Sequence, residues 1–113
     1  VGKLIYNDFS IMFMGDATSK IENQLLAYGA GLKSDILKIG HHGSKYSSFP
    51  IFLKTVAPKA GIIEVGAKNF YGHPSPAALS RFKMFGTNIF RTDQNGDVRI
   101  FSDGFTTNIF TDR

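Results

Sequence analysis

Residues 35–44 read DILKIGHHGS, and this stretch decides the fold. A short apolar run bounded by turn residues is typical of a buried strand, and the glycines around His41 and His42 end the run and begin a polar loop. Two other apolar runs end in the same way, one just before Asp16 and one a short loop before His73. All three histidines and Asp16 are therefore predicted to follow the ends of strands.

The composition is that of an ordinary globular domain. With 113 residues, of which 42% are hydrophobic and 19% are charged, residues 1–113 are expected to form a single domain with a modest core. Eleven residues are phenylalanine, so either the core is rich in phenylalanine or part of this surface packs on something outside the chain. The net charge of +4 weakly favours an anionic partner such as nucleic acid or a phosphate ester.

The sequence excludes cysteine chemistry and a membrane-spanning helix. The chain has no cysteine, which rules out disulfides, thiolate metal sites and a cysteine nucleophile, so any metal must be bound by histidine and carboxylate. No apolar run approaches the roughly 20 residues that a membrane-spanning helix needs. We therefore expect a soluble domain without a membrane segment.

The patterns along the chain predict alternating strands and helices. Ser19 and Glu22 have the spacing of a capping box, and Ser75 followed by Pro76 is typical of a helix start. The Asn-Gly pair within residues 93–97 predicts a hairpin turn between two strands. The predicted strands are residues 3–6, 9–14, 35–39, 61–65, 87–91, 98–101 and 105–110; the predicted helices are residues 19–29, a short one after Ser47 or Ser48 that ends at Pro58, and one from Pro76 to Gly86. The strand–helix–strand order indicates one α/β unit with a parallel crossover.

The polar residues after the strands form a candidate site. Carboxyl ends of parallel strands face a shared crevice, so Asp16, His73 and either His41 or His42 could converge there. Imidazoles and a carboxylate, without sulfur, suit zinc, manganese or iron used for hydrolysis. The ordinary alternatives are that each histidine only occupies a loop and that Asp16 is an acid placed before a helix, where the helix dipole favours it.

Four segments together resemble a known family. They are FMGDA at residues 13–17, DILKIGHHGS at 35–44, VGAKNFYGHP at 65–74 and FRTDQNG at 90–96. In this order and spacing they resemble the carboxyl-terminal half of metallo-β-lactamase-fold hydrolases, and most of all the ComEC-type domain of competence DNA-uptake proteins. The likeness runs from Lys3 to about Ser102. It implies half of an αββα sandwich: a mixed sheet with helices on one face, ending in an antiparallel hairpin.

The resemblance also implies roles for the site residues. Asp16 is similar to the carboxylate that bridges two divalent metal ions, zinc or manganese, and His73 to a ligand of the second ion. His41 and His42 match positions whose imidazoles contact the scissile phosphate or stabilise developing charge, and the sequence does not say which of the two points inward. The implied function is metal-dependent hydrolysis of phosphodiester bonds, nuclease-like and linked to DNA uptake.

One departure from the family pattern changes the expectation. The first metal-binding box of the family, His-x-His-x-Asp-His, does not occur, and the chain has only three histidines. We therefore expect half of a larger domain, inactive alone and binding metal weakly or not at all. The missing amino-terminal half or a second copy should cover its exposed sheet face, and the parent protein would be attached to a membrane. The alternatives are a non-catalytic module for binding or assembly, and a related choline-phosphate esterase.

Overall fold

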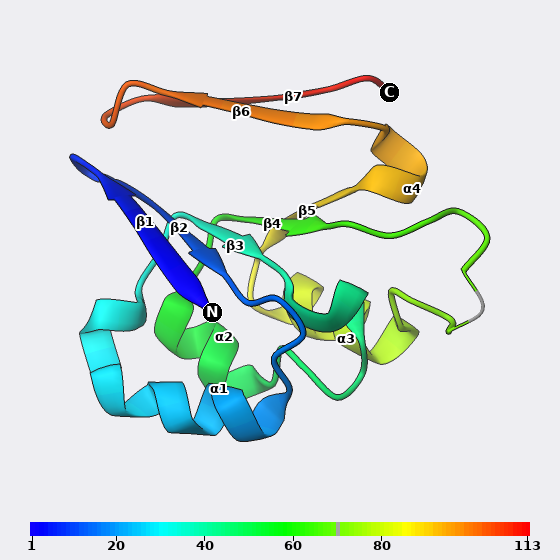
Figure 1. Ribbon diagram of the computed structural model, residues 1–113, viewed down its shortest axis with the longest axis horizontal. Coiled ribbons are helices and arrows are strands. Elements are labelled where there is room, and N and C mark those ends of the chain that lie inside the picture. Colours follow the sequence, from blue (N-terminus) through cyan, green and yellow to red (C-terminus); the bar gives the residue numbers. More distant parts are fainter. Residues whose placement is uncertain (70) are drawn as a thin grey trace.

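The predicted strands before residue 92 form one mixed sheet. The computed structural model describes residues 1–69 and 71–113, and within them the sheet has the order β1-β2-β3-β4-β5. β1 pairs antiparallel with β2, and the other neighbours are parallel, so the expected crossover is present (Figure 1). The strands are β1 (Gly2–Tyr6), β2 (Phe9–Phe13), β3 (Ile36–Lys38), β4 (Ala60–Ile63) and β5 (Asn88–Arg91).

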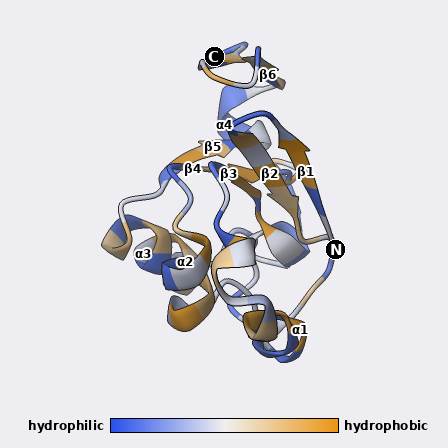
Figure 2. Cartoon of the chain, turned by 90° about the vertical axis from the view of Figure 1, so that its left-hand side faces the viewer, coloured by the Kyte–Doolittle hydropathy of each residue, from blue (hydrophilic) through white to orange (hydrophobic). Residues whose placement is uncertain are grey.

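The helices cover one face of this sheet, as expected from the sequence. Figure 2 shows α1, α2 and α3 on one side of the strands. Leu37 and Ile63 from the sheet and Phe52, Val56 and Phe82 from the helices are all fully buried in one cluster. Burial of this apolar surface is the main stabilising contribution to the fold. The helices on this face are α1 (Ser19–Leu25), the 3-10 segment η1 (Leu26–Leu32), α2 (Pro50–Val56) and α3 (Pro76–Met84).

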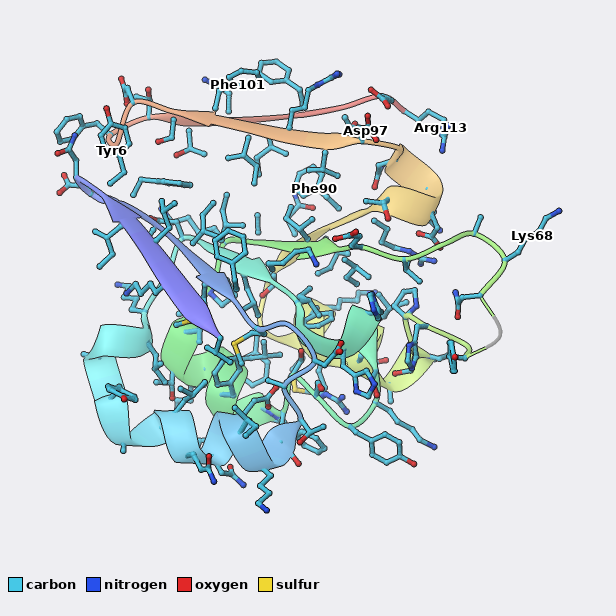
Figure 3. The ribbon with its side chains drawn as sticks, viewed as in Figure 1. Tyr6, Lys68, Phe90, Asp97, Phe101 and Arg113 are labelled. Carbon is cyan, nitrogen blue, oxygen red and sulfur yellow. The ribbon has the colours of Figure 1, made fainter. Side chains whose placement is uncertain are left out.

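A two-stranded hairpin packs on the opposite face of the sheet. It consists of β6 (Val98–Ser102) and β7 (Thr107–Thr111), which pair antiparallel (Figure 1). Ile100 and Ile109 of the hairpin pack on Ile36 and Ile62 of the sheet, and Phe90 lies between the two layers (Figure 3). An open space of about 670 Å³ remains between the sheet and β6. The hairpin therefore covers part of this face.

The outer side of the hairpin carries two exposed phenylalanines. Phe101 and Phe110 are 58% and 52% exposed, and their ring centroids are 5.7 Å apart in an edge-to-face contact. Figure 3 shows Phe101 on the side of the hairpin that faces away from the sheet. Some of the phenylalanines are thus on the surface. Exposed apolar patches promote association. Self-association or docking of a missing half stays a prediction.

The predicted hairpin turn at residues 93–97 is wrong. Residues Thr92–Asn95 form a single helical turn, α4, and β5 joins β4 while β6 pairs with β7. The side chain of Asn95 accepts a hydrogen bond from the Arg91 N–H at 2.9 Å, which closes the turn. Because β5 completes one sheet and β6 covers its other face, tertiary packing overrides the local preference of Asn-Gly for a hairpin.

The predicted capping box of the first helix is also wrong. Thr18 is the N-cap and makes no side-chain cap, and α1 ends at Leu25 rather than near residue 29. Glu22 is 2% exposed and accepts hydrogen bonds from the N–H groups of Ser48 and Phe49. Its carboxylate therefore joins the first helix to a loop 26 residues further along the chain. Burial raises the pKa of Glu22 above 4.5, although these two bonds oppose the shift.

The starts of the other two helices differ from each other. Phe49 is the N-cap of α2 without a side-chain bond, so the prediction that Ser47 or Ser48 caps it is wrong. The Ser47 hydroxyl instead donates to the Ala17 carbonyl at 2.6 Å. The Ser75 cap of α3 is confirmed, because its hydroxyl accepts from the Ala78 N–H at 3.1 Å. In the part of the chain that the structure describes, no helix is both long and apolar enough to cross a membrane.

Candidate functional site

The histidine pair lies in an unusual backbone conformation. His41 and His42 both have φ of +52°, the left-handed region, within the short turn Gly40–Gly43 after β3. A Cβ at Gly40 would lie 3.0 Å from the Met14 Cβ, so the close approach of the two segments leaves little room for a side chain there. The His41 N–H donates to the Gly15 carbonyl at 2.7 Å. The histidine turn is thus fastened to the turn that contains Asp16.

The same turn is also fastened to the Gly-His-Pro segment. A Cβ on Gly43 would lie 2.7 Å from the Pro74 Cβ, and the Gly43 carbonyl accepts from the Ser75 N–H at 2.9 Å. As a result the rings of His41 and His73 meet edge to face with centroids 5.6 Å apart. The structure therefore brings His41 and His73 together from segments that are far apart in the sequence.

Asn69 organises the loop that holds His73, and the sequence reasoning missed it. Its side-chain N–H donates to the carbonyls of Gly66, at 3.0 Å, and His73, at 2.7 Å. Its side-chain oxygen accepts from the N–H groups of Tyr71, at 3.2 Å, and His73, at 3.0 Å. Asparagine side chains often bond to nearby backbone in loops, and this general preference is the only sequence signal that could have pointed to Asn69. Tyr71, also missed, stacks on His73 with centroids 5.8 Å apart.

His42 has a defined tautomer. Its Nδ1 lies 2.6 Å from the Glu64 carbonyl oxygen, and because a carbonyl can only accept, Nδ1 donates. Nε2 is therefore the ring nitrogen left for a ligand or a proton. The Glu64 side chain, directly after β4, is exposed and pairs with Lys38 at 3.4 Å.

Two open hollows adjoin the histidines. The "Glu64 hollow", of about 260 Å³, is lined by His42, Glu64, Val65, Gly66, Asn69, Tyr71 and His73. The "Tyr46 hollow", of about 480 Å³, is lined by His41, Ser44, Lys45, Tyr46, Tyr71, Gly72, His73 and Ser75. Tyr71 and His73 line both hollows and so stand between them. Both histidines of the pair therefore reach a solvent-accessible space, each on its own side of His73.

The surroundings of His73 favour its neutral form. Partial burial lowers the pKa of His73 below 6.5, and the positive charge that His41 and His42 carry when protonated lowers it further. A neutral imidazole has a lone pair free for a metal or a proton. The Nδ1 atom of His41 is buried and has no hydrogen-bond partner among the described residues. These features favour a reactive rather than a structural role for the cluster, since buried polar groups are normally paired.

The described residues do not fit a complete metal centre. Asp16 is exposed, and it lines neither of the two hollows that adjoin His73. Within residues 1–69 and 71–113, no three side chains of the metal-binding types gather closely enough to hold an ion. A tight zinc site needs three or four protein ligands. The metal roles of Asp16 and His73 therefore stay predictions that require ligands from outside this chain.

Three known proteins contain a segment that is similar in sequence to the chain. The chain is similar to ComE operon protein 3 of Bacillus subtilis (36% identity over 90 residues, 80% of the chain), competence protein ComA of Neisseria gonorrhoeae (35% over 98 residues, 86%) and recombination protein 2 of Haemophilus influenzae (35% over 104 residues, 92%). The chain is related to a segment of these proteins. Their names support the ComEC-type competence family that the sequence motifs resemble. The chain spans only 12–14% of the length of these relatives. No protein-family model and no solved structure matches the chain.

Proposed function

We propose that the chain is the carboxyl-terminal part of a domain that hydrolyses phosphodiester bonds of DNA during DNA uptake. The observation that supports this most is that the histidine turn contacts both the turn at Gly15 and the segment at Pro74. The histidine turn bonds to Gly15 on one side and packs on Pro74 on the other, so that His42 and His73 line one hollow and His41 and His73 line the other. The relatives named for competence and recombination supply the proposed biological context.

In this proposal each residue has a distinct task. His42 presents Nε2 toward a phosphoryl oxygen and can donate a hydrogen bond when protonated, because Nδ1 is held by the Glu64 carbonyl. The lowered pKa of His73 favours its neutral form, which has a lone pair free for a metal ion. Asp16 and His73 would contribute part of the ligand set for two divalent ions, zinc or manganese. The missing amino-terminal half of the domain would supply the other ligands.

A second candidate is a non-catalytic module that binds nucleic acid or supports assembly. It is favoured by one specific observation: the part of the chain that the structure describes contains no group of three metal-binding side chains. In that case the two hollows bind their ligand without cleaving it. A metal-binding box in the coding sequence upstream of this chain would favour the hydrolase.

Variants in the intact parent protein test the hydrolase. Asp16→Ala and His73→Ala should each lower bound metal and abolish cleavage of linear DNA. His42→Ala should keep its metal and lose roughly 100-fold or more in turnover, the size expected for loss of a donor to developing charge. Asp8→Ala, an exposed carboxylate in the turn after β1, is the matched control and should be unchanged. Full turnover in Asp16→Ala and His73→Ala would reject the hydrolase and leave the binding module.

A further inference from the structure

We propose that the Tyr46 hollow binds an unpaired nucleobase of a DNA strand, stacked on Tyr46 and Tyr71. This inference deepens the proposed function and rests on it for the choice of DNA. It names the form of the substrate: a single strand, or a strand with its bases unpaired, rather than a regular duplex.

The rings of Tyr46 and Tyr71 are exposed. Tyr71 is 82% exposed and Tyr46 is 60% exposed, yet both line the same hollow. One face of Tyr71 already stacks on His73 at an interplanar angle of 26°, so the opposite face of the ring is the one that a base can cover. Bases stack on exposed aromatic rings in proteins that bind single strands, and each such contact changes affinity by about 5- to 150-fold.

Hydrogen bonds fix the backbone at Tyr46 and at Tyr71. The Tyr46 N–H donates to the Ser44 hydroxyl at 3.1 Å, and its carbonyl accepts from the Ser19 N–H at 3.0 Å. On the other side of the hollow, the Tyr71 N–H donates to the Asn69 side chain at 3.2 Å. Exposed aromatic rings on a fixed backbone are preorganised for a ligand, so less conformational entropy is lost on binding.

The Tyr46 hollow is lined by a cation and by two of the histidines. The Lys45 Nζ lies 5.2 Å from the centroid of the Tyr46 ring, and Lys45 lines the same hollow. A cation beside an aromatic face suits a stacked base joined to an anionic backbone. The hollow of about 480 Å³ is of the size that small ligands occupy. His41 and His73 line the same hollow, so a base there places its phosphodiester beside the imidazoles.

Binding measurements with three labelled probes test the proposal. They are a short oligothymidylate, an abasic strand with the same number of phosphates, and a duplex of the same length. The chain should bind the oligothymidylate more tightly than the abasic strand. Tyr71→Ala and Tyr46→Ala should each weaken oligothymidylate binding about 5-fold or more and leave the abasic strand unchanged. Tyr71→Phe should restore binding because stacking needs only the ring. Tyr28→Ala, at a 72% exposed tyrosine in η1, is the control and should have no effect.

A spectroscopic readout reports stacking directly. The chain has no tryptophan, so Tyr71→Trp introduces a single reporter, and Tyr28→Trp is its control. Oligothymidylate should quench the fluorescence of Tyr71→Trp and leave that of Tyr28→Trp unchanged.

The outcomes separate this inference from the function on which it rests. Equal binding of the oligothymidylate and the abasic strand, unaffected by the tyrosine variants, would overturn stacking while the phosphodiester proposal survives. Tighter binding of the duplex than of the oligothymidylate would also overturn it. Absence of binding to all three probes would count against both proposals.

Discussion

Replacing Glu22 by alanine should destabilise the fold by about 3–4 kcal/mol. The carboxylate is 2% exposed and accepts from two N–H groups, those of Ser48 and Phe49. Each buried N–H left without a partner costs about 1–3 kcal/mol, so the loss of both amounts to about 2–6 kcal/mol. Phe49 is only half-buried and water can reach it more easily, which places the expected value near the middle of that range.

The measurement is urea unfolding followed by far-ultraviolet circular dichroism. Because folded domains are stable by only about 5–15 kcal/mol, this loss should move the midpoint strongly at unchanged slope. Glu22→Gln keeps one acceptor and should lose less than Glu22→Ala. Gln24→Ala, at an exposed position of the same helix, should stay within about 0.5 kcal/mol of the wild type. A loss below about 1 kcal/mol for Glu22→Ala would refute the assignment of this carboxylate as the link between α1 and the loop before α2.

Three further predictions concern stability. Burial raises the pKa of Glu22, so the folded chain binds this proton more readily than the unfolded chain. The stability of the wild type relative to Glu22→Gln should therefore rise as pH falls from the raised folded pKa to 4.5, and a flat or opposite pH profile in urea titrations would contradict this. Gly43→Ala, at φ +79° with no room for a Cβ, should lower the free energy of unfolding by about 2–4 kcal/mol. Gly66→Ala, in open space, should lower it by under about 1 kcal/mol. Thermal unfolding measures both losses, and equal losses would contradict the close packing at Gly43. Ser75→Ala should cost about 1 kcal/mol by removing the cap of α3, and the exposed Ser80→Ala should not lower the midpoint comparably.

Apolar runs bounded by turn residues were enough to predict the sheet. The strands before residue 92 appear close to their predicted positions, because a buried parallel strand leaves a continuous apolar run in the sequence. Ser75 and Pro76 likewise mark the start of α3 correctly, since both signals act within one turn of helix. Local signals therefore predict local structure well in this chain.

The errors arise where a side chain acts on a distant segment. Glu22 has the spacing of a capping box, yet its carboxylate bonds to residues 26 and 27 positions away, a contact that no helical pattern predicts. The sequence before Val98 is typical of a hairpin turn between β5 and β6. Instead, β6 packs on the second face of the sheet and pairs with β7. In the site, the apolar runs predict that the histidines follow strand ends, whereas the hydrogen bonds by which Asn69 holds the His73 loop appear only in the folded chain.

The left-handed backbone of the histidine pair has a consequence for selection. Each non-glycine residue in this region costs about 1–2 kcal/mol, and here two occur in succession. A library randomised at positions 41 and 42 and screened only for heat resistance should therefore enrich glycine at both. Under the proposed function, the same library screened for DNA cleavage should return histidine, because a strained backbone is retained where a functional group requires it. Comparing the survivors of the two screens separates the requirements of folding from those of chemistry at a single turn.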